Sequence, residues 1–83
     1  MQRIENGILL DTDGADFLAE QKKQGMIHRL YRQGEQHFLL VYNPVQDPKE
    51  GNLRTITLEA ARSWGETLSV EDYIRAFGSV EEA

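Results

Sequence analysis

Two aspartates near the amino-terminal end of the chain are the residues whose type and spacing could most readily do chemistry. Asp11 and Asp13 follow the apolar run Ile8–Leu10 and precede Gly14. Such a run predicts a short β-strand that stops at a turn and delivers both carboxylates to one loop. Two carboxylates in one loop could hold a divalent cation or serve as nucleophile and acid–base. The alternative is a structural turn in which an aspartate caps the backbone.

Residues 8–14 resemble the nucleophile motif of haloacid-dehalogenase-like phosphatases. The resemblance implies that Asp11 would attack phosphorus while Asp13 would act as acid and base beside Mg²⁺. The sequence departs from that family because Ala15 replaces the expected threonine, and residues 15–83 are too few for a doubly wound scaffold. We therefore expect a protein that is not an enzyme, and a minimal phosphatase-like enzyme at Asp11 and Asp13 is the least favoured alternative.

Metal ligands are sparse elsewhere in the chain. A calcium loop starting at Asp11 would need a bidentate glutamate at its twelfth position, where the sequence has Lys22. The chain contains no cysteine, and its two histidines, His28 and His37, are expected to face each other only loosely across a hairpin. Two histidines without a third ligand make a poor metal site. We expect no metal and no cofactor.

The charge balance narrows the classes of partner. The net charge is −5, from 14 acidic and 9 basic residues, and residues 59–83 hold six acidic against two basic residues, a local net of −4. An acidic chain lacks the positive charge that dominates nucleic-acid affinity, so direct nucleic-acid binding is not expected. The apolar runs are too short for a membrane span and the first residues do not resemble a signal peptide. A soluble, cytoplasmic protein is expected.

The middle of the chain carries the clearest β-pattern. Met26–Arg32 and His37–Tyr42 are rich in β-branched and aromatic residues and flank a glycine-containing turn, which predicts an antiparallel hairpin. Leu53–Leu58 alternates polar and apolar residues and predicts a further strand. We expect Met26–Arg32 to lie at the edge of the sheet, where its backbone could pair with a second copy.

Residues 15–24 are compatible with two structures. A helix would place Leu18 and Ala19 on one face and the lysine pair at 22–23 at its carboxyl end, where the helix dipole favours cations. A strand would instead turn Ala15, Phe17 and Ala19 inward, because every second residue of a strand points to the same face. Residue propensities favour the helix slightly, and both structures remain open.

The carboxyl-terminal part predicts two short helices. Thr57 can cap a first helix over residues 58–66, and Ser69 can cap a second over residues 70–77, with Asp72 placed for a capping box. The second helix has one apolar stripe, formed by Val70, Tyr73, Ile74 and Phe77. The predicted fold is a single α+β domain over residues 1–83: a small, mainly antiparallel sheet of three to four strands with two short carboxyl-terminal helices packed on one face.

The outward face of this helix pair is the candidate interaction site. Its charged residues are Glu59, Arg62, Glu66, Glu71, Asp72 and Arg75. The absence of a workable catalytic set, together with this acidic face, favours a small protein-binding module whose partner is another protein. A structural or self-assembling module, in which the chain forms a homodimer, is the alternative.

The order of motifs also resembles a group of short uncharacterised proteins of phages and other bacterial mobile elements. The resemblance spans residues 11–78, and the loop at residues 43–52 departs from it. It rests on Asp11-Thr12, Ala15, Leu18-Ala19, Leu30-Tyr31-Arg32, Phe38-Leu39, Ile56 to Ala61, Trp64, Leu68-Ser69, Glu71-Asp72-Tyr73 and Phe77-Gly78. It implies a mobile-element origin, no known enzyme activity and no functional residue, and it is compatible with an inhibitor of a host protein.

Overall fold

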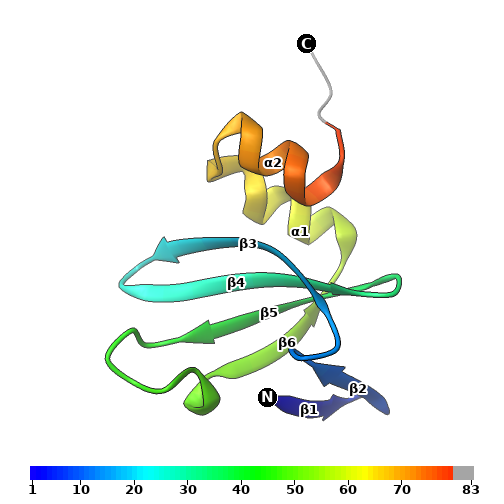
Figure 1. Cartoon of the computed structure of the whole chain (residues 1–83), viewed down its shortest axis with the longest axis vertical. Coiled ribbons are helices and arrows are strands. Elements are labelled where there is room, and N and C mark those ends of the chain that lie inside the picture. Colours follow the sequence, from blue (N-terminus) through cyan, green and yellow to red (C-terminus); the bar gives the residue numbers. More distant parts are fainter. Residues whose placement is uncertain (80–83) are drawn as a thin grey trace.

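A computed structural model describes residues 1–79, which form six β-strands, two α-helices and two short 3₁₀-helices (Figure 1). In chain order these are β1 (Gln2–Glu5), β2 (Ile8–Asp11), β3 (Asp16–Lys23), β4 (Met26–Gln33), β5 (Gln36–Tyr42), η1 (Pro48–Glu50), β6 (Asn52–Ile56), α1 (Leu58–Trp64), η2 (Gly65–Thr67) and α2 (Val70–Phe77). Strands that precede a carboxyl-terminal helix pair confirm the predicted α+β class.

All strand pairs in the described residues are antiparallel. β1 and β2 form a two-stranded hairpin, and β3 to β6 form a four-stranded meander in the order β3-β4-β5-β6. The hairpin turns at Asn6 and Gly7, whose φ angles of 52° and 78° match the turn that suits the right-handed twist of the strands. The predicted hairpin of β4 and β5 is confirmed, but β4 is internal because it pairs with both β3 and β5. The prediction that Met26–Arg32 forms a sheet edge was wrong.

Of the two structures left open for residues 15–24, the slightly favoured helix was wrong and the strand is correct, because Asp16–Lys23 is the edge strand β3. The strand contains a bulge at which Leu18 and Ala19 together oppose the single residue Leu30 of β4. The extra residue interrupts the alternation of a regular strand. Leu18 and Ala19 therefore both lie beside Leu30 of β4. Adjacent apolar residues are also found on one face of an α-helix, so the bulge produces a helix-like pattern in the sequence.

The four-stranded sheet buries different side chains on its two faces. Residues paired across strands share a face, so Tyr31 and Phe38 lie together, and their rings stack with centroids 5.2 Å apart. The hairpin covers this face by inserting Leu10 of β2, which is fully buried. The core cluster comprises Leu10, Tyr31, Phe38, Leu40, Tyr42 and Leu53.

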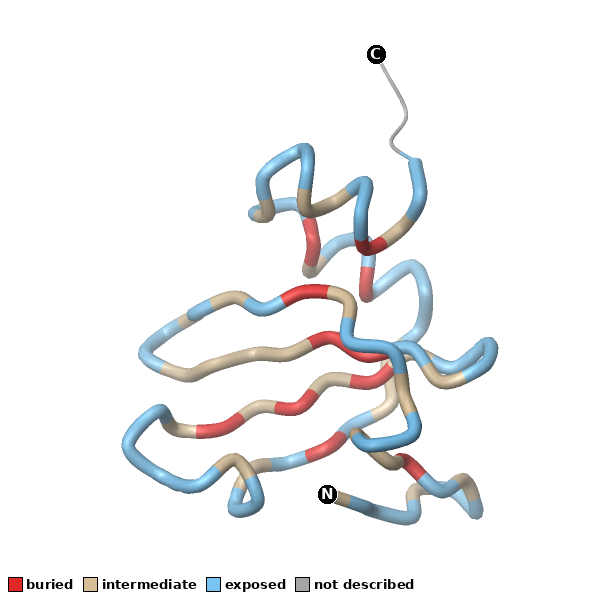
Figure 2. Tube along the Cα trace, viewed as in Figure 1, coloured by how far each residue is buried: buried red, intermediate tan, exposed pale blue. Residues whose placement is uncertain are grey.

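The helix pair covers the opposite face, where Ala19 and Leu30 are buried. Figure 2 shows that only short stretches of the helix pair are buried. The buried side chains of the two helices are small, Ala61 and Ala76. In Figure 1 the helices lie at the β3 side of the sheet and the hairpin at the β6 side. The sheet thus separates a large core under the hairpin from a thinner layer under the helices.

Both predicted helix starts are confirmed. The hydroxyl of Thr57 accepts a hydrogen bond from the Ala60 N–H at 3.0 Å, and the hydroxyl of Ser69 accepts one from the Asp72 N–H at 3.1 Å. These bonds satisfy amide groups that the first turn of each helix leaves without a partner. α1 ends at Trp64, and the chain continues as η2 from Gly65 before α2 begins.

The predicted apolar stripe of α2 is only partly buried. Tyr73 and Phe77 pack together with ring centroids 4.7 Å apart, and both lie against Gly65. Val70 and Ile74, however, leave 67% and 42% of their surface exposed. The stripe therefore packs through its two aromatic residues and leaves its two aliphatic residues at the surface.

Candidate functional site: the grooves of the helix pair

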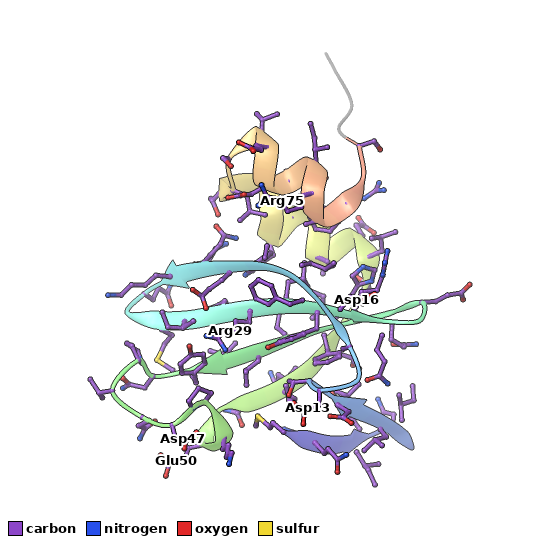
Figure 3. The ribbon with its side chains drawn as sticks, viewed as in Figure 1. Asp13, Asp16, Arg29, Asp47, Glu50 and Arg75 are labelled. Carbon is purple, nitrogen blue, oxygen red and sulfur yellow. The ribbon has the colours of Figure 1, made fainter. Side chains whose placement is uncertain are left out.

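The aspartates of residues 11–13 form a structural turn. Asp11 Oδ1 accepts a hydrogen bond from the Asp13 N–H at 3.0 Å, and Asp11 Oδ2 accepts one from Gln2 Nε2 at 3.2 Å. The Gln2 amide and then the Asp13 N–H hold the pKa of Asp11 below its ordinary value. The loop lies by the hairpin, whereas Arg75 of α2 lies on the helix pair at the other side of the sheet (Figure 3).

The two histidines do not face each other. His28 is paired with Val41, and His37 with Arg32, so their positions differ by four residues along β5, or about 13 Å. Within residues 1–79, no three histidine, aspartate or glutamate side chains come together as a metal site. The expected loose facing of the histidines was wrong because the hairpin register sets them too far apart.

His28 lies on the sheet face that the helices cover. Its Nδ1 atom is buried and has no hydrogen-bond partner, and the same holds for Nε1 of Trp64. Burial and then the charge of Lys23 lower the pKa of His28. Burial and the charge of Arg32 likewise lower the pKa of His37. Both imidazoles therefore favour their neutral form.

The carbonyl group of Trp64 links the helix pair to β3 through two side chains of that strand. Gln21 Nε2 and Lys23 Nζ both donate hydrogen bonds to the Trp64 carbonyl oxygen, at 2.9 and 3.2 Å. Lys23 Nζ also lies 5.6 Å from the centroid of the Trp64 ring. Trp64 is the last residue of α1, where carbonyl groups lack helical partners and attract a cation. The anchor fixes where the outer surface of the helices lies relative to the sheet.

The structure divides the six predicted site residues into two groups. Glu59, Arg62 and Glu66 line one open groove on the outer side of α1 and η2. The α2 residues instead form ion pairs among themselves, with Arg75 lying 2.9 Å from Asp72 and 3.4 Å from Glu71. Asp72 and Arg75 also line a separate groove between α2 and the bulged part of β3. Five of the six residues therefore line two separate grooves, and Glu71 pairs with Arg75 beside the second.

Glu66 lines a second groove as well, between η2 and α2. The other residues of this groove are Gly65, Leu68, Val70 and Tyr73. Gly65 allows the close packing here, because a Cβ atom at this position would lie 2.8 Å from the ring of Phe77 and 3.3 Å from that of Tyr73. Glu66 is thus shared by a mostly polar groove on α1 and a mostly apolar groove beside α2.

Sequence reasoning missed the apolar part of these grooves. Leu68 precedes the Ser69 cap and Tyr73 follows it by four residues, which is the spacing of a hydrophobic staple across a helix start. That spacing could have placed Leu68 against α2. Val70 offered no such signal, because its helical spacing with Tyr73 is equally typical of a buried position.

Comparisons with known proteins identify no relative of this chain. A scan against family models, a search of curated proteins and a search of solved structures each found no match to the chain. Among residues 1–79, no helix has the length and apolar character needed to cross a membrane. The functional proposal therefore depends on the grooves and their chemistry.

Proposed function

We propose that this chain is a small non-enzymatic module that binds another protein through the outer surface of its helix pair. The observation that supports the proposal is the position of Glu66, which joins the α1 groove to the η2–α2 groove. Leu58 and Val70, which line the two grooves, are 47% and 67% exposed. Exposed apolar side chains bordered by polar residues are typical of interaction surfaces. We call these two adjoining grooves the Glu66 surface.

The protection of the sheet edges also favours the helix pair as the binding surface. At the β6 edge, the Glu5 carboxylate accepts a hydrogen bond from the Thr55 N–H at 2.9 Å. At the β3 edge, the bulge interrupts the ladder, and Glu20 and Lys22 add charge. Bulges, charges and covering segments are the means by which proteins prevent strand addition.

A self-assembling module is the second candidate, and a different surface supports it. Ile4 and Leu9 are paired across the β1–β2 hairpin and are 71% and 47% exposed. This apolar pair on the outer face of the hairpin could contact the same pair of a second copy. Light scattering at several concentrations separates the candidates, because a strict monomer excludes the homodimer.

Site-specific cross-linking tests the protein-binding function. A photo-reactive amino acid would replace Ser63, which lines the α1 groove, and in a control variant it would replace the exposed Lys49 in η1. In lysate of the source cells, we expect one protein to be captured through position 63 and not through position 49. Glu66→Lys should reduce the capture, and Glu50→Lys should not. Equal capture at both positions, or none at position 63, would contradict the proposal.

A mobile-element inhibitor of a host protein is one role that such a module could fill. Under that role the captured protein would be a host component whose activity falls when the wild-type chain is added. The Glu66→Lys variant would restore that activity, and the Glu50→Lys variant would not. A captured protein whose activity is unchanged by the chain would leave the binding function in place and remove the inhibitor role.

A further inference from the structure

The η2–α2 groove has a chemistry that specifies its partner more closely. Leu68, Val70 and Tyr73 provide the apolar lining, and Glu66 supplies a carboxylate to the groove. Gly65 keeps the chain of η2 close to α2, because it has no side chain to hold the two apart. The groove therefore combines an apolar binding site with one carboxylate at its side.

The carboxylates of the helix pair differ in whether they are neutralised. Glu71 and Asp72 are both within ion-pair distance of Arg75. Among the salt bridges and side-chain hydrogen bonds of residues 1–79, none involves Glu66, although Arg62 is four residues before it in the sequence. Glu66 is exposed. It therefore presents a negative charge that a cation on a partner can approach.

We infer that the η2–α2 groove binds a segment of another protein in which an apolar side chain is followed by a lysine or arginine on the same face. The apolar side chain would contact Leu68, Val70 and Tyr73, and the cation would lie beside the Glu66 carboxylate. This inference rests on the proposed protein-binding function and names the class of partner. An acidic segment or a nucleic-acid phosphate would instead meet the repulsion of Glu66 within a chain of net charge −5.

The expected complex is weak and depends on salt. Binding at one small apolar site beside one exposed carboxylate buries far less surface than a permanent interface does. The contact is therefore expected to be transient. Exposed ion pairs contribute little and are screened by salt, which limits the effect of losing the Glu66 charge to about two- to fivefold in Kd. The apolar contact contributes more binding free energy than the ion pair does. A charge introduced at Val70 should therefore weaken binding by at least about tenfold.

Two synthetic peptides provide the test. One contains leucine, alanine and lysine, and the other has the same sequence with glutamate in place of every lysine. The isotope-labelled wild-type chain is titrated with each, and amide shifts are followed by NMR. We expect the lysine peptide to shift amides within residues 65–73, with an affinity that falls as salt is added, and the glutamate peptide to shift none.

Matched variants test the roles of the individual residues. Glu66→Gln should weaken the lysine peptide by about two- to fivefold, whereas Glu71→Gln, which alters a paired carboxylate on the same helix pair, should not. Val70→Asp should weaken it by at least about tenfold. Equal binding of both peptides, shifts centred elsewhere, no binding, or an unchanged Kd in Glu66→Gln would each overturn the inference.

Failure of this inference can be distinguished from failure of the proposed protein-binding function. If cross-linking at position 63 captures a partner but the lysine peptide shows no preference, protein binding stands and the basic, apolar partner class is excluded. If cross-linking captures nothing from the lysate, the proposed function fails whatever the peptides do.

Discussion

The Glu5 carboxylate and the Thr55 backbone N–H form a hydrogen bond of 2.9 Å between the β1–β2 hairpin and the outer edge of β6. The two residues are 50 positions apart in the chain. At the other end of the hairpin, the side-chain amide of Gln33 donates to the Leu9 carbonyl at 2.7 Å and accepts from the Asp11 N–H at 3.1 Å. Side chains thus pair with backbone groups at strand edges that would otherwise be open, and they hold the hairpin over the main core.

Replacement of Glu5 by alanine should both destabilise the fold and expose the β6 edge. Loss of a charge-assisted bond to a partly buried amide should lower the free energy of unfolding by about 1–2 kcal/mol. The released Thr55 N–H should also favour association of β6 edges. Urea denaturation and light scattering measure the two effects. Glu5→Gln keeps an acceptor oxygen and serves as the control, so equal losses in both variants would contradict this role of the bond.

Gly65→Ala should destabilise the helix pair through close packing. Gly65 is buried, and an added Cβ would lie 2.8 Å from the Phe77 ring, which is too close for an ordinary contact. We expect the free energy of unfolding to fall by about 1–3 kcal/mol, as for other overpacked positions. Gly14→Ala is the matched control, because its nearest neighbour atom would lie at 3.6 Å. A thermal melt that shows equal shifts for both variants would exclude the packing explanation.

The sequence predicted local structure wherever a short-range signal decides it. Thr57 and Ser69 cap their helices as expected because a cap depends on hydroxyl and amide groups only three residues apart. The hairpin of β4 and β5 follows in the same way from β-rich runs on either side of a glycine turn. Its position inside the sheet could not be predicted, because that depends on where β3 and β6 pair.

The error at β3 has a physical cause in its bulge and its lysines. Leu18 and Ala19 oppose one residue of β4, which produces a pair of apolar neighbours typical of a helix. Lys23 does bind the carboxyl end of a helix, as its position suggested, but the helix is α1, 41 residues later in the chain. The sequence therefore indicated that Lys23 binds the carboxyl end of a helix, but it did not indicate which helix.

The candidate site was predicted in part for a related reason. Glu59, Arg62 and Glu66 share a groove because residues three and four apart lie on one helix face. The pairing of Arg75 with Glu71 and Asp72 has the same spacing, but it neutralises those carboxylates. The exposure of Val70 depends on how η2 turns the chain before α2, which no local pattern specifies.

Stability should fall as pH decreases from neutrality, because both histidines have a lowered pKa in the folded protein. Below the ordinary value of 6.5, the unfolded chain binds protons that the folded chain does not, so acid favours unfolding. The stability is fully present above that value and decreases below it. Chemical denaturation at several pH values between neutrality and the range where carboxylates titrate measures the effect.

Histidine variants assign this pH dependence. His28→Gln should flatten the profile in part, and the double variant with His37→Gln should flatten it further. Trp64 is the single tryptophan of the chain, so its fluorescence follows unfolding near the helix pair directly. If the double variant retains the slope of the wild type, groups other than the two imidazoles control acid stability in this range.

Lys23→Met should loosen the helix pair on the sheet without disturbing the strand. Lys23 Nζ donates to the Trp64 carbonyl oxygen at 3.2 Å, and methionine keeps an apolar stem while it removes the charge and the donor. We expect the free energy of unfolding to fall by about 0.5–1 kcal/mol, because the carbonyl keeps its bond from Gln21. The emission of Trp64 should also change, since the cation near its ring is lost.

Lys22→Met is the matched control for this anchor. Lys22 is the exposed neighbour of Lys23, and it pairs with Ile27 on the face of the sheet turned away from the helices. Its replacement should leave both stability and Trp64 emission unchanged. If the two variants lose equal stability and change Trp64 emission equally, the total charge of β3 affects the fold. The Lys23–Trp64 hydrogen bond then makes no specific contribution. If only Lys23→Met responds, the anchor holds α1 in place and sets the position of the Glu66 surface.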